Sequence, residues 1–407
     1  MGKLRPEAWK TAALVGAAGA VLLVGYDAAR RTAVNQLRAA YGEGAEASVL
    51  SAMPLGVLAV IALAGMLLTR QGPRKTFRTT ALACAGALAL CQVGVISGFQ
   101  PATLGFAFMR EIYVVLMIEQ LWSLLNSALT EREARALNGP VTGIGSLGAI
   151  AGALAVGPIA GLIGADAMPA LSVGTVLLAA VLVDRAYAVA GEPQPPVDPP
   201  EASDTLGLGP LLRSRTLLLL LGVVLVTRVL SATVSLGFEG AVAAASADPA
   251  AAAATEDGVY AALNGLIAVM QFVAAPLLLT YLPTGLVWVG LPLVQLGASL
   301  ALLLWPGVGT AAAALIVFRS FEYSLFRDTK ELFYQSRGFA VRYRSKLLID
   351  VLGHRGGKAM LALLLGAPTL ANTRLVSLSP GLSVAAALVW VGLAAAMVRG
   401  GAMNDQI

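Results

Sequence analysis

Long runs of apolar residues follow one another along almost the whole 407-residue chain. A transmembrane helix needs about 20 consecutive, mainly apolar residues, and twelve segments meet that requirement. The composition agrees, because 13% of the residues are charged, whereas soluble domains contain about 25%. The sequence therefore predicts an all-α membrane protein embedded in a lipid bilayer. The expected spans lie near 11–37, 47–69, 79–97, 102–128, 138–163, 168–184, 215–238, 258–280, 284–304, 308–334, 346–366 and 377–398.

Basic residues are distributed unevenly between the two sides of these spans. With the amino terminus in the cytoplasm, the cytoplasmic segments contain 17 Lys and Arg residues, and the outer loops contain only Arg38 and Arg374. Cytoplasmic loops of membrane proteins carry an excess of Lys and Arg. We therefore expect both termini in the cytoplasm.

A Pro-rich polar segment, GEPQPPVDPPEASDTL at 191–206, interrupts the apolar pattern near the middle of the chain. Its composition is typical of a semi-rigid linker. We predict a six-helix half over 1–190, a cytoplasmic linker over 191–214 and a second six-helix half over 215–407. This organisation is typical of major-facilitator-like transporters, whose halves are built from three-helix repeats. The Ala-rich segment 240–257 is expected to be a mobile loop or a frayed helix.

Sequence motifs for cofactor or metal chemistry are missing. GIGSLG at 143–148 fits the pattern G-x-G-x-x-G, which binds dinucleotides only within a βαβ unit, but it falls inside the fifth span. Gly148 and Gly152 form a G-x-x-x-G pattern that close helix packing explains. His354 has no ligand partners at useful spacing, and no P-loop occurs. We expect no enzyme activity, cofactor, metal or nucleic-acid partner.

Seven charged residues within the spans are the most informative, because a charge at mid-bilayer costs about 2.5–3.5 kcal/mol on insertion scales. Arg228 is expected near the middle of the seventh span, and Arg319 and Glu322 near the middle of the tenth. Such charges should face a water-filled cavity and pair with one another, although a purely structural ion pair would also explain them. The seven residues are Asp27, Arg110, Glu111, Glu119, Arg228, Arg319 and Glu322.

Charge is concentrated between Arg319 and Lys358, where 13 of 40 residues are charged, against 51 of 407 in the chain. In this segment, one helix face is expected to carry Tyr323, Arg327 and Lys330. Basic groups beside an aromatic ring suit a phosphorylated, ring-bearing anion. For Lys330, an interfacial position and a gate pair with a nearby carboxylate remain alternatives. The remaining basic residues are expected to anchor topology in the cytoplasm: Arg337, Arg342, Arg344 and Lys346.

From Tyr323 the chain reads YSLFRDTKELFYQSRGFAVRYRSKLLIDVLGHRGGK. This stretch resembles the ATP/ADP translocases of plastids and obligate intracellular bacteria, which have Y-S-L-F-D-P-T-K-E, a basic loop and D-V-x-G-x-R-x-G-K. Three other segments resemble the same family more weakly: YDAARRTAVNQL, LWSLLNSALTEREAR and EDGVYAALNG. The resemblance therefore extends along the whole chain. The family has Lys-Asp where this chain has Ala33 and Val34, and Asp-Pro where it has Arg327 and Asp328. The loss of a cation weakens the case for ATP itself.

The resemblance implies a twelve-helix carrier that exchanges nucleotides, a monomer in the bacterial inner membrane. We predict a secondary transporter for nucleotides or other phosphorylated metabolites, working by alternating access without ATP hydrolysis. The alternatives are a proton-coupled exporter using Glu322, Glu111 or Glu119, a lipid transporter, and a non-transporting membrane receptor. The predicted substrate-binding residues are Tyr26, Arg30, Arg31, Asn126, Arg228, Arg319, Glu322, Tyr323, Arg327, Lys330, Glu331, Asp350, Arg355 and Lys358.

Overall fold

The computed structural model describes residues 4–42, 45–164, 167–193, 207–246, 248–350, 353 and 372–401. Within these ranges, nine helices are long and apolar enough to cross a membrane. The chain forms two compact units. Unit 1 comprises Met1–Leu208 with Arg337–Leu348, and unit 2 comprises Gly209–Ser336 with Ile349–Ile407.

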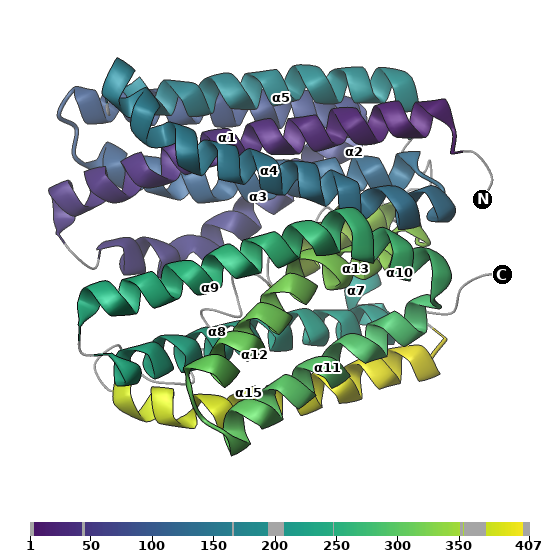
Figure 1. Ribbon diagram of the computed structural model, residues 1–407. Coiled ribbons are helices and arrows are strands. Elements are labelled where there is room, and N and C mark those ends of the chain that lie inside the picture. The colour runs from purple at the N-terminus through teal and green to yellow at the C-terminus, as the bar shows by residue number, and fades with distance from the viewer. Residues whose placement is uncertain are drawn as a thin grey trace. The chain divides into compact units, whose positions relative to one another are not determined.

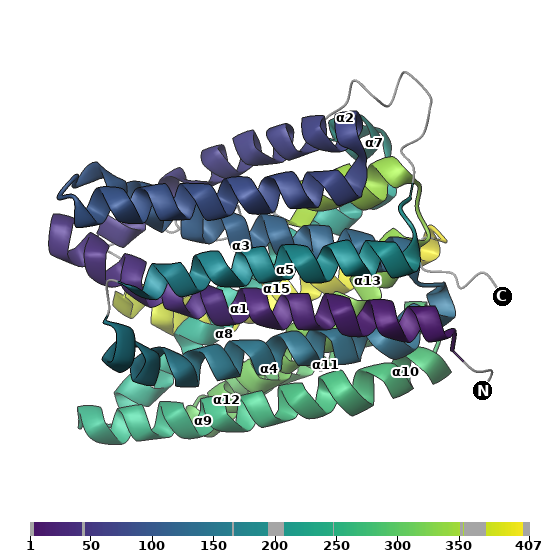
Figure 2. The same cartoon turned by 90° about the horizontal axis from the view of Figure 1, so that it is seen from above.

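Unit 1 is built around α1 (Pro6–Tyr41), which packs along α4 (Glu131–Ile163) and α5 (Met168–Ala190) (Figure 1). It also contains α2 (Ala45–Ile96), α3 (Pro101–Ala128) and a π-helical turn, η4 (Val341–Ser345). α2 covers both the second and the third expected spans. Its two arms meet at Gly72, whose φ of 76° and ψ of 170° are not helical (Figure 2). A glycine occupies this bend because a positive φ carries no steric cost without a Cβ.

Small residues allow α1 and α4 to approach closely. A Cβ added at Gly148 would lie 2.3 Å from the Cα of Ala20, and one at Gly152 would lie 2.8 Å from the Cα of Val24. Both distances are shorter than a carbon–carbon contact allows, so the two backbones meet where these side chains are absent. GIGSLG therefore lies on a packed helix, and the helix-packing interpretation of Gly148 and Gly152 is confirmed.

The amino-terminal ends of α1 and α4 are joined by polar contacts. Thr130 caps α4 in a capping box with Glu133, each side chain bonding the other's backbone N–H. Arg5, just before α1, donates from Nη2 to Glu133 Oε2 at 2.6 Å. A capping box satisfies backbone donors that a helix start otherwise leaves unpaired. Glu133 thus serves both the local helix start and a contact 128 residues away in sequence.

Unit 2 contains two helices that run side by side, α8 (Arg215–Ala245) and α15 (Asn372–Arg399), with α11 (Thr284–Leu304) against α15 (Figure 1). A short helix, α7 (Leu208–Arg213), precedes α8. The expected eighth span is α9 (Pro249–Val269), the π-helical turn η2 (Met270–Ala274) and α10 (Ala275–Tyr281). The expected tenth span is α12 (Val308–Phe321), the π-helical turn η3 (Glu322–Phe326) and α13 (Arg327–Gln335).

The segment 240–257 and the expected eleventh span differ from the other parts of unit 2 in how they compare with the sequence-based expectations. The segment 240–257 was expected to be a mobile loop or a frayed helix, but α8 continues to Ala245 and α9 begins at Pro249. The mobile alternative is therefore wrong, because alanine favours helix and Asp248 caps α9 by accepting from the Ala250 N–H at 3.0 Å. The eleventh expected span, 346–366, lies mostly outside the described residues.

An aromatic cluster holds η3 within unit 2. The ring of Phe326 stacks on Trp288 of α11 and meets Trp390 of α15 edge-on, both at centroid distances of 5.5 Å. Phe318 of α12 packs against Trp390 at 6.4 Å. All four side chains are buried. Offset and edge-to-face aromatic pairs add about 0.5–1.5 kcal/mol beyond their area burial, so the position of η3 is fixed by its neighbours.

Candidate functional site

A charged cluster in unit 2 joins α8 to the tenth span. Arg228 Nη2 forms an ion pair with Glu322 Oε1, and Arg319 Nη1 contacts the other carboxylate oxygen at 3.2 Å. The side chains of Arg228 and Glu322 are 11% and 4% exposed. The expected pairing among Arg228, Arg319 and Glu322 is confirmed. Two guanidinium groups share one carboxylate, so the cluster carries a formal charge of +1.

Tyr323 adds an aromatic surface to this cluster. Arg319 donates to the Tyr323 hydroxyl at 3.3 Å and to Ser235 Oγ at 3.2 Å, and its guanidinium carbon lies 5.8 Å from the Tyr323 ring centroid. The Tyr323 side chain is exposed, at 40%. The cluster, defined here as Arg228, Ser235, Arg319, Glu322 and Tyr323, therefore offers a net positive charge next to an accessible ring.

Lys330 belongs to a separate group in unit 2. Its Nζ lies 2.6 Å from Asp350 Oδ1, and the two side chains are 12% and 4% exposed. The Tyr334 hydroxyl donates to the same oxygen at 3.4 Å, and Lys330 Nζ lies 6.0 Å from the Tyr334 ring centroid. The structure contains the predicted pair between Lys330 and a nearby carboxylate, which is that of Asp350. The ammonium of Lys330 is therefore paired with a carboxylate and largely shielded by the protein.

The expected shared face of Tyr323, Arg327 and Lys330 needs a correction. That expectation assumed 3.6 residues per turn throughout, but η3 interposes a π-helical turn between Tyr323 and Arg327. One additional residue rotates everything beyond it by about 100° relative to a continuous α-helix. Arg327 and Lys330 remain three residues apart within α13, whereas Tyr323 interacts with Arg319 instead.

A second charged cluster lies in unit 1, between α1 and α3. Tyr26 donates to Glu111 Oε1 at 3.1 Å, and Arg110 Nε lies 3.3 Å from the same oxygen. Arg110 Nη1 donates to the backbone carbonyl of Arg30 at 2.9 Å, and Arg30 Nη2 lies 3.4 Å from Asp27 Oδ1. Tyr26 and Arg30 were predicted site residues. Asp27, Arg110 and Glu111 were not, although their intramembrane charge was the signal that could have included them.

The other predicted site residues are dispersed. Arg31 donates to the backbone carbonyl of Ala153 at 3.0 Å, and the backbone carbonyl of Asn126 accepts from Arg342 at 3.4 Å. Glu331 is buried in α13. Arg355 and Lys358 lie outside the described residues.

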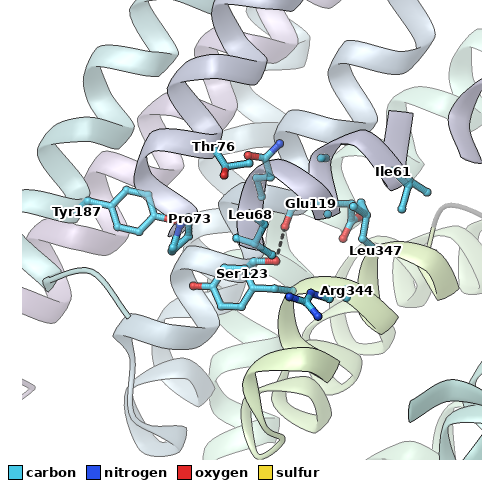
Figure 3. A pocket seen from close by; sticks show the side chains of 13 residues that line it. Ile61, Leu68, Pro73, Thr76, Glu119, Ser123, Tyr187, Arg344 and Leu347 are labelled. Atoms are coloured by element: carbon cyan, nitrogen blue, oxygen red, sulfur yellow. Dashed lines mark hydrogen bonds between the residues drawn. The ribbon is translucent and has the colours of Figure 1, made fainter. Parts of the chain in front are cut away.

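Unit 1 also contains a pocket between α2, α3, α5 and η4 (Figure 3), with a volume of about 480 Å³ including space open to solvent. Next to it, the ammonium of Lys346 forms an ion pair with Glu119 of α3. The lining residues are Ile61, Ala64, Gly65, Leu68, Pro73, Thr76, Glu119, Gln120, Ser123, Tyr187, Tyr343, Arg344 and Leu347.

Two basic residues near this pocket are buried in the protein. Arg344 and Lys346, which were expected to act as cytoplasmic topology anchors, are 4% and 0% exposed, and their side of the membrane stays a prediction. Arg344 donates to Thr69 Oγ1 at 2.7 Å. The Tyr343 and Ser127 hydroxyls lie 2.8 Å apart, and burial raises the pKa of Tyr343 to about 12. Tyr343 therefore stays neutral and able to donate, and η4 is held by specific polar contacts within unit 1.

Comparisons with known proteins place this geometry on a transporter fold. No protein-family model and no curated protein matches the sequence. A bacterial homologue of the iron transporter ferroportin has a TM-score of 0.71 at 13% identity, over 96% of this chain and 100% of that chain. The E. coli fucose:proton symporter has a TM-score of 0.67 at 13% identity, over 94% of this chain and 97% of that chain. A human organic anion transporter has a TM-score of 0.65 at 11% identity, over 97% of this chain and 99% of that chain.

These three solved structures are of transporters, and a further solved structure that matches is described as a Major Facilitator Superfamily transporter. The predicted all-α, major-facilitator-like fold is confirmed. At 11–15% identity the likeness concerns the fold and not the substrate. The chain therefore has the fold of the major facilitator transporters.

Proposed function

We propose that this protein is a secondary transporter that moves a small organic anion by alternating access, and that a phosphorylated metabolite of the nucleotide class is its substrate. Alternating access opens one binding site to one side of the membrane at a time. The fold supports the general activity. The resemblance of the segment from Tyr323 to Lys358 to nucleotide exchangers supports the substrate class, and one solved structure of the same fold is an organic anion transporter.

The observation that carries the proposal is the unit 2 cluster. Guanidinium groups recognise phosphate through two parallel N–H···O bonds. Arg228 and Arg319 each contact a different oxygen of the Glu322 carboxylate, so both guanidinium groups reach one anionic group, and Tyr323 supplies a ring on which a planar group can stack. Charge inside a membrane protein is costly and marks ion and substrate pathways. An anion with an aromatic ring satisfies both parts of the cluster.

The charge of the cluster favours a substrate of low charge. Two cations and one carboxylate leave a formal +1, and Lys330 is already matched by Asp350. A nucleoside monophosphate or a sugar phosphate fits this better than ATP, for which the absent first-span Lys at Ala33 would be needed. Nucleoside monophosphates are therefore the first compounds to test.

The test is ligand-dependent melting of purified protein in detergent. AMP, UMP, glucose 6-phosphate and ATP are added to wild type, to Arg319→Gln and to Arg78→Gln. Arg78 is an exposed residue of α2 and loses the same charge outside the cluster. A charge-assisted hydrogen bond contributes about 1.5–3 kcal/mol, so Arg319→Gln should lose most of the shift while Arg78→Gln retains it. Absence of a shift in wild type with every compound contradicts the proposed substrate class.

A second candidate, proton-coupled transport, is favoured by the unit 1 cluster. Asp27 and Glu111 are 8% and 6% exposed. Arg30 is the cation that pairs with Asp27, and its side chain is 52% exposed. Carboxylates inside membrane proteins also mark proton relays. Two of the matching structures are described as proton symporters.

Asp27 lies next to Arg30 on α1, and Glu111 contacts Tyr26 on α1 and Arg110 on α3. If Asp27 carries the proton, substrate addition to unbuffered wild type should change the pH, and Asp27→Asn should not respond. An equal pH response from Asp27→Asn would remove this residue from proton coupling.

A further inference from the structure

Two π-helical turns of unit 2, η2 and η3, pack against each other. The contact includes a hydrogen bond between a side chain of one turn and the backbone of the other, in which Gln271 Nε2 of η2 donates to the carbonyl oxygen of Tyr323 in η3 at 2.9 Å. Gln271 is buried, with 1% of its surface exposed. π-Helical turns are rare, and many occur at functional sites.

The cause of η2 can be found in the sequence. Pro276 has no N–H, so it cannot continue the hydrogen-bond ladder of an α-helix. The N–H of Ala275 reaches back five residues to the carbonyl of Met270, which widens the turn and places Gln271 against η3. η3 contains no proline.

In η3, the backbone has given up an α-helical bond. The N–H of Arg327 would donate to the carbonyl of Tyr323 in an α-helix, but it donates to the carbonyl of Ser324. The carbonyl of Tyr323 is thereby released from that bond, and it accepts a hydrogen bond from Gln271 Nε2. The widened turn in the tenth span and the amide of Gln271 are therefore matched to each other.

The wide turn determines which groups of the tenth span meet. Glu322 and Tyr323, within η3, belong to the charged cluster with Arg228 and Arg319. Lys330, beyond η3, meets Asp350. Return of η3 to an α-helical turn would rotate one set relative to the other by about 100°.

We infer that Gln271 is a positioning residue of the substrate site, because it holds η3 in the wide form that presents Glu322 and Tyr323. The role in substrate binding rests on the proposed function, whereas the role in holding the turn does not. If Gln271 only filled space, an apolar side chain would serve better, since its own Oε1 is buried without a hydrogen-bond partner. Capture of the Tyr323 carbonyl explains why an amide is present.

The chain offers a matched control in Gln295 of α11. It is also 1% exposed and has a buried Oε1 without a partner, but its Nε2 contacts Ser299 Oγ of its own helix, at 3.3 Å. Methionine has the length of glutamine and no donor, so Gln271→Met and Gln295→Met remove comparable groups. The two variants differ in whether the lost donor served η3.

Two readouts separate the turn from the proposed function. Trp288 and Trp390 contact Phe326 of η3, so their fluorescence reports the position of the turn without any ligand. Trp9, Trp122 and Trp305 are replaced by phenylalanine to isolate this signal. The second readout is the melting shift with AMP, in which loss of one hydrogen bond should weaken binding about fivefold.

We expect Gln271→Met to change the emission of Trp288 and Trp390 and to weaken the AMP response, and Gln295→Met to change neither. Wild-type emission together with a wild-type AMP response in Gln271→Met would overturn the inference. Changed emission without any AMP response in wild type would leave Gln271 holding the turn and would count against the proposed substrate.

Hydrogen exchange of wild type covers the case in which Gln271→Met does not fold. Amides of 322–327 should exchange faster than those of α12, and equal protection would contradict a wide turn.

Discussion

Lys330 Nζ and Asp350 Oδ1 lie 2.6 Å apart in unit 2, with the Tyr334 hydroxyl donating to the same carboxylate oxygen. Lys330 is the residue that best matches the cation of the nucleotide exchangers, yet it is already neutralised. A cation in this state can bind a substrate phosphate only by exchanging one anionic partner for another. The pair is therefore expected to determine how costly it is to bring an anion to Lys330.

Lys330→Ala should destabilise the protein, because it leaves Asp350 buried without the ammonium. Breaking a buried ion pair by removal of one partner costs about 3–5 kcal/mol. The double variant Lys330→Ala, Asp350→Asn should recover much of the loss, since Asp350 then no longer leaves an uncompensated carboxylate. Melting temperatures in detergent test this, and a double variant no more stable than the single one would show that the pair contributes little.

Gly148→Ala should weaken the packing of α4 on α1. The added methyl group meets the backbone of Ala20, which cannot move aside as a side chain could, and overpacking costs about 1–3 kcal/mol. Gly161→Ala on the same helix is the control, because a Cβ there meets no atom within 4 Å. It should be neutral or stabilising by up to about 1 kcal/mol. Equal effects of the two substitutions on the unfolding midpoint would contradict the close contact.

The sequence predicts some of these features well and others poorly. Hydropathy locates the spans because a bilayer imposes a length and an apolar composition on each. The expected Arg228–Glu322 pair also follows from the bilayer, which makes an unmatched charge costly. The π turn at η3 cannot be predicted in this way, because its carbonyl partner comes from Gln271, 52 residues earlier.

The burial of Lys346 was missed for a related reason. Read locally, a basic residue in a polar segment after the tenth span is a topology signal. Its carboxylate partner, Glu119, is 227 residues away in sequence, and nothing near Lys346 indicates that the two meet. Intramembrane carboxylates such as Glu119 were identified, but the sequence does not specify which cation each one contacts.

Tyr343→Phe should reduce stability by about 1 kcal/mol, the typical contribution of one hydrogen bond. The Tyr343 hydroxyl pairs with Ser127 Oγ at 2.8 Å, and burial holds its pKa at about 12. Because the hydroxyl is protonated far above neutral pH, the loss should be the same at pH 6 and pH 9. Ser127→Ala and the double variant complete a thermodynamic cycle. Additive effects in that cycle would show that the two hydroxyls do not interact.

Glu322→Gln distinguishes a substrate site from a structural ion pair. In the structural case, loss of the carboxylate leaves Arg228 and Arg319 without their anion, and the protein is simply less stable. In the substrate case the apo protein is also less stable, but a phosphate now meets two guanidinium groups and no competing carboxylate. The formal charge of the cluster rises from +1 to +2.

We therefore expect Glu322→Gln to melt at a lower temperature than wild type without ligand, and its melting temperature to rise more than that of wild type when AMP is added. Salt should reduce the gain, since screening weakens accessible charge interactions. A variant stabilised equally by AMP and by adenosine would show that the phosphate is not what the two arginines bind.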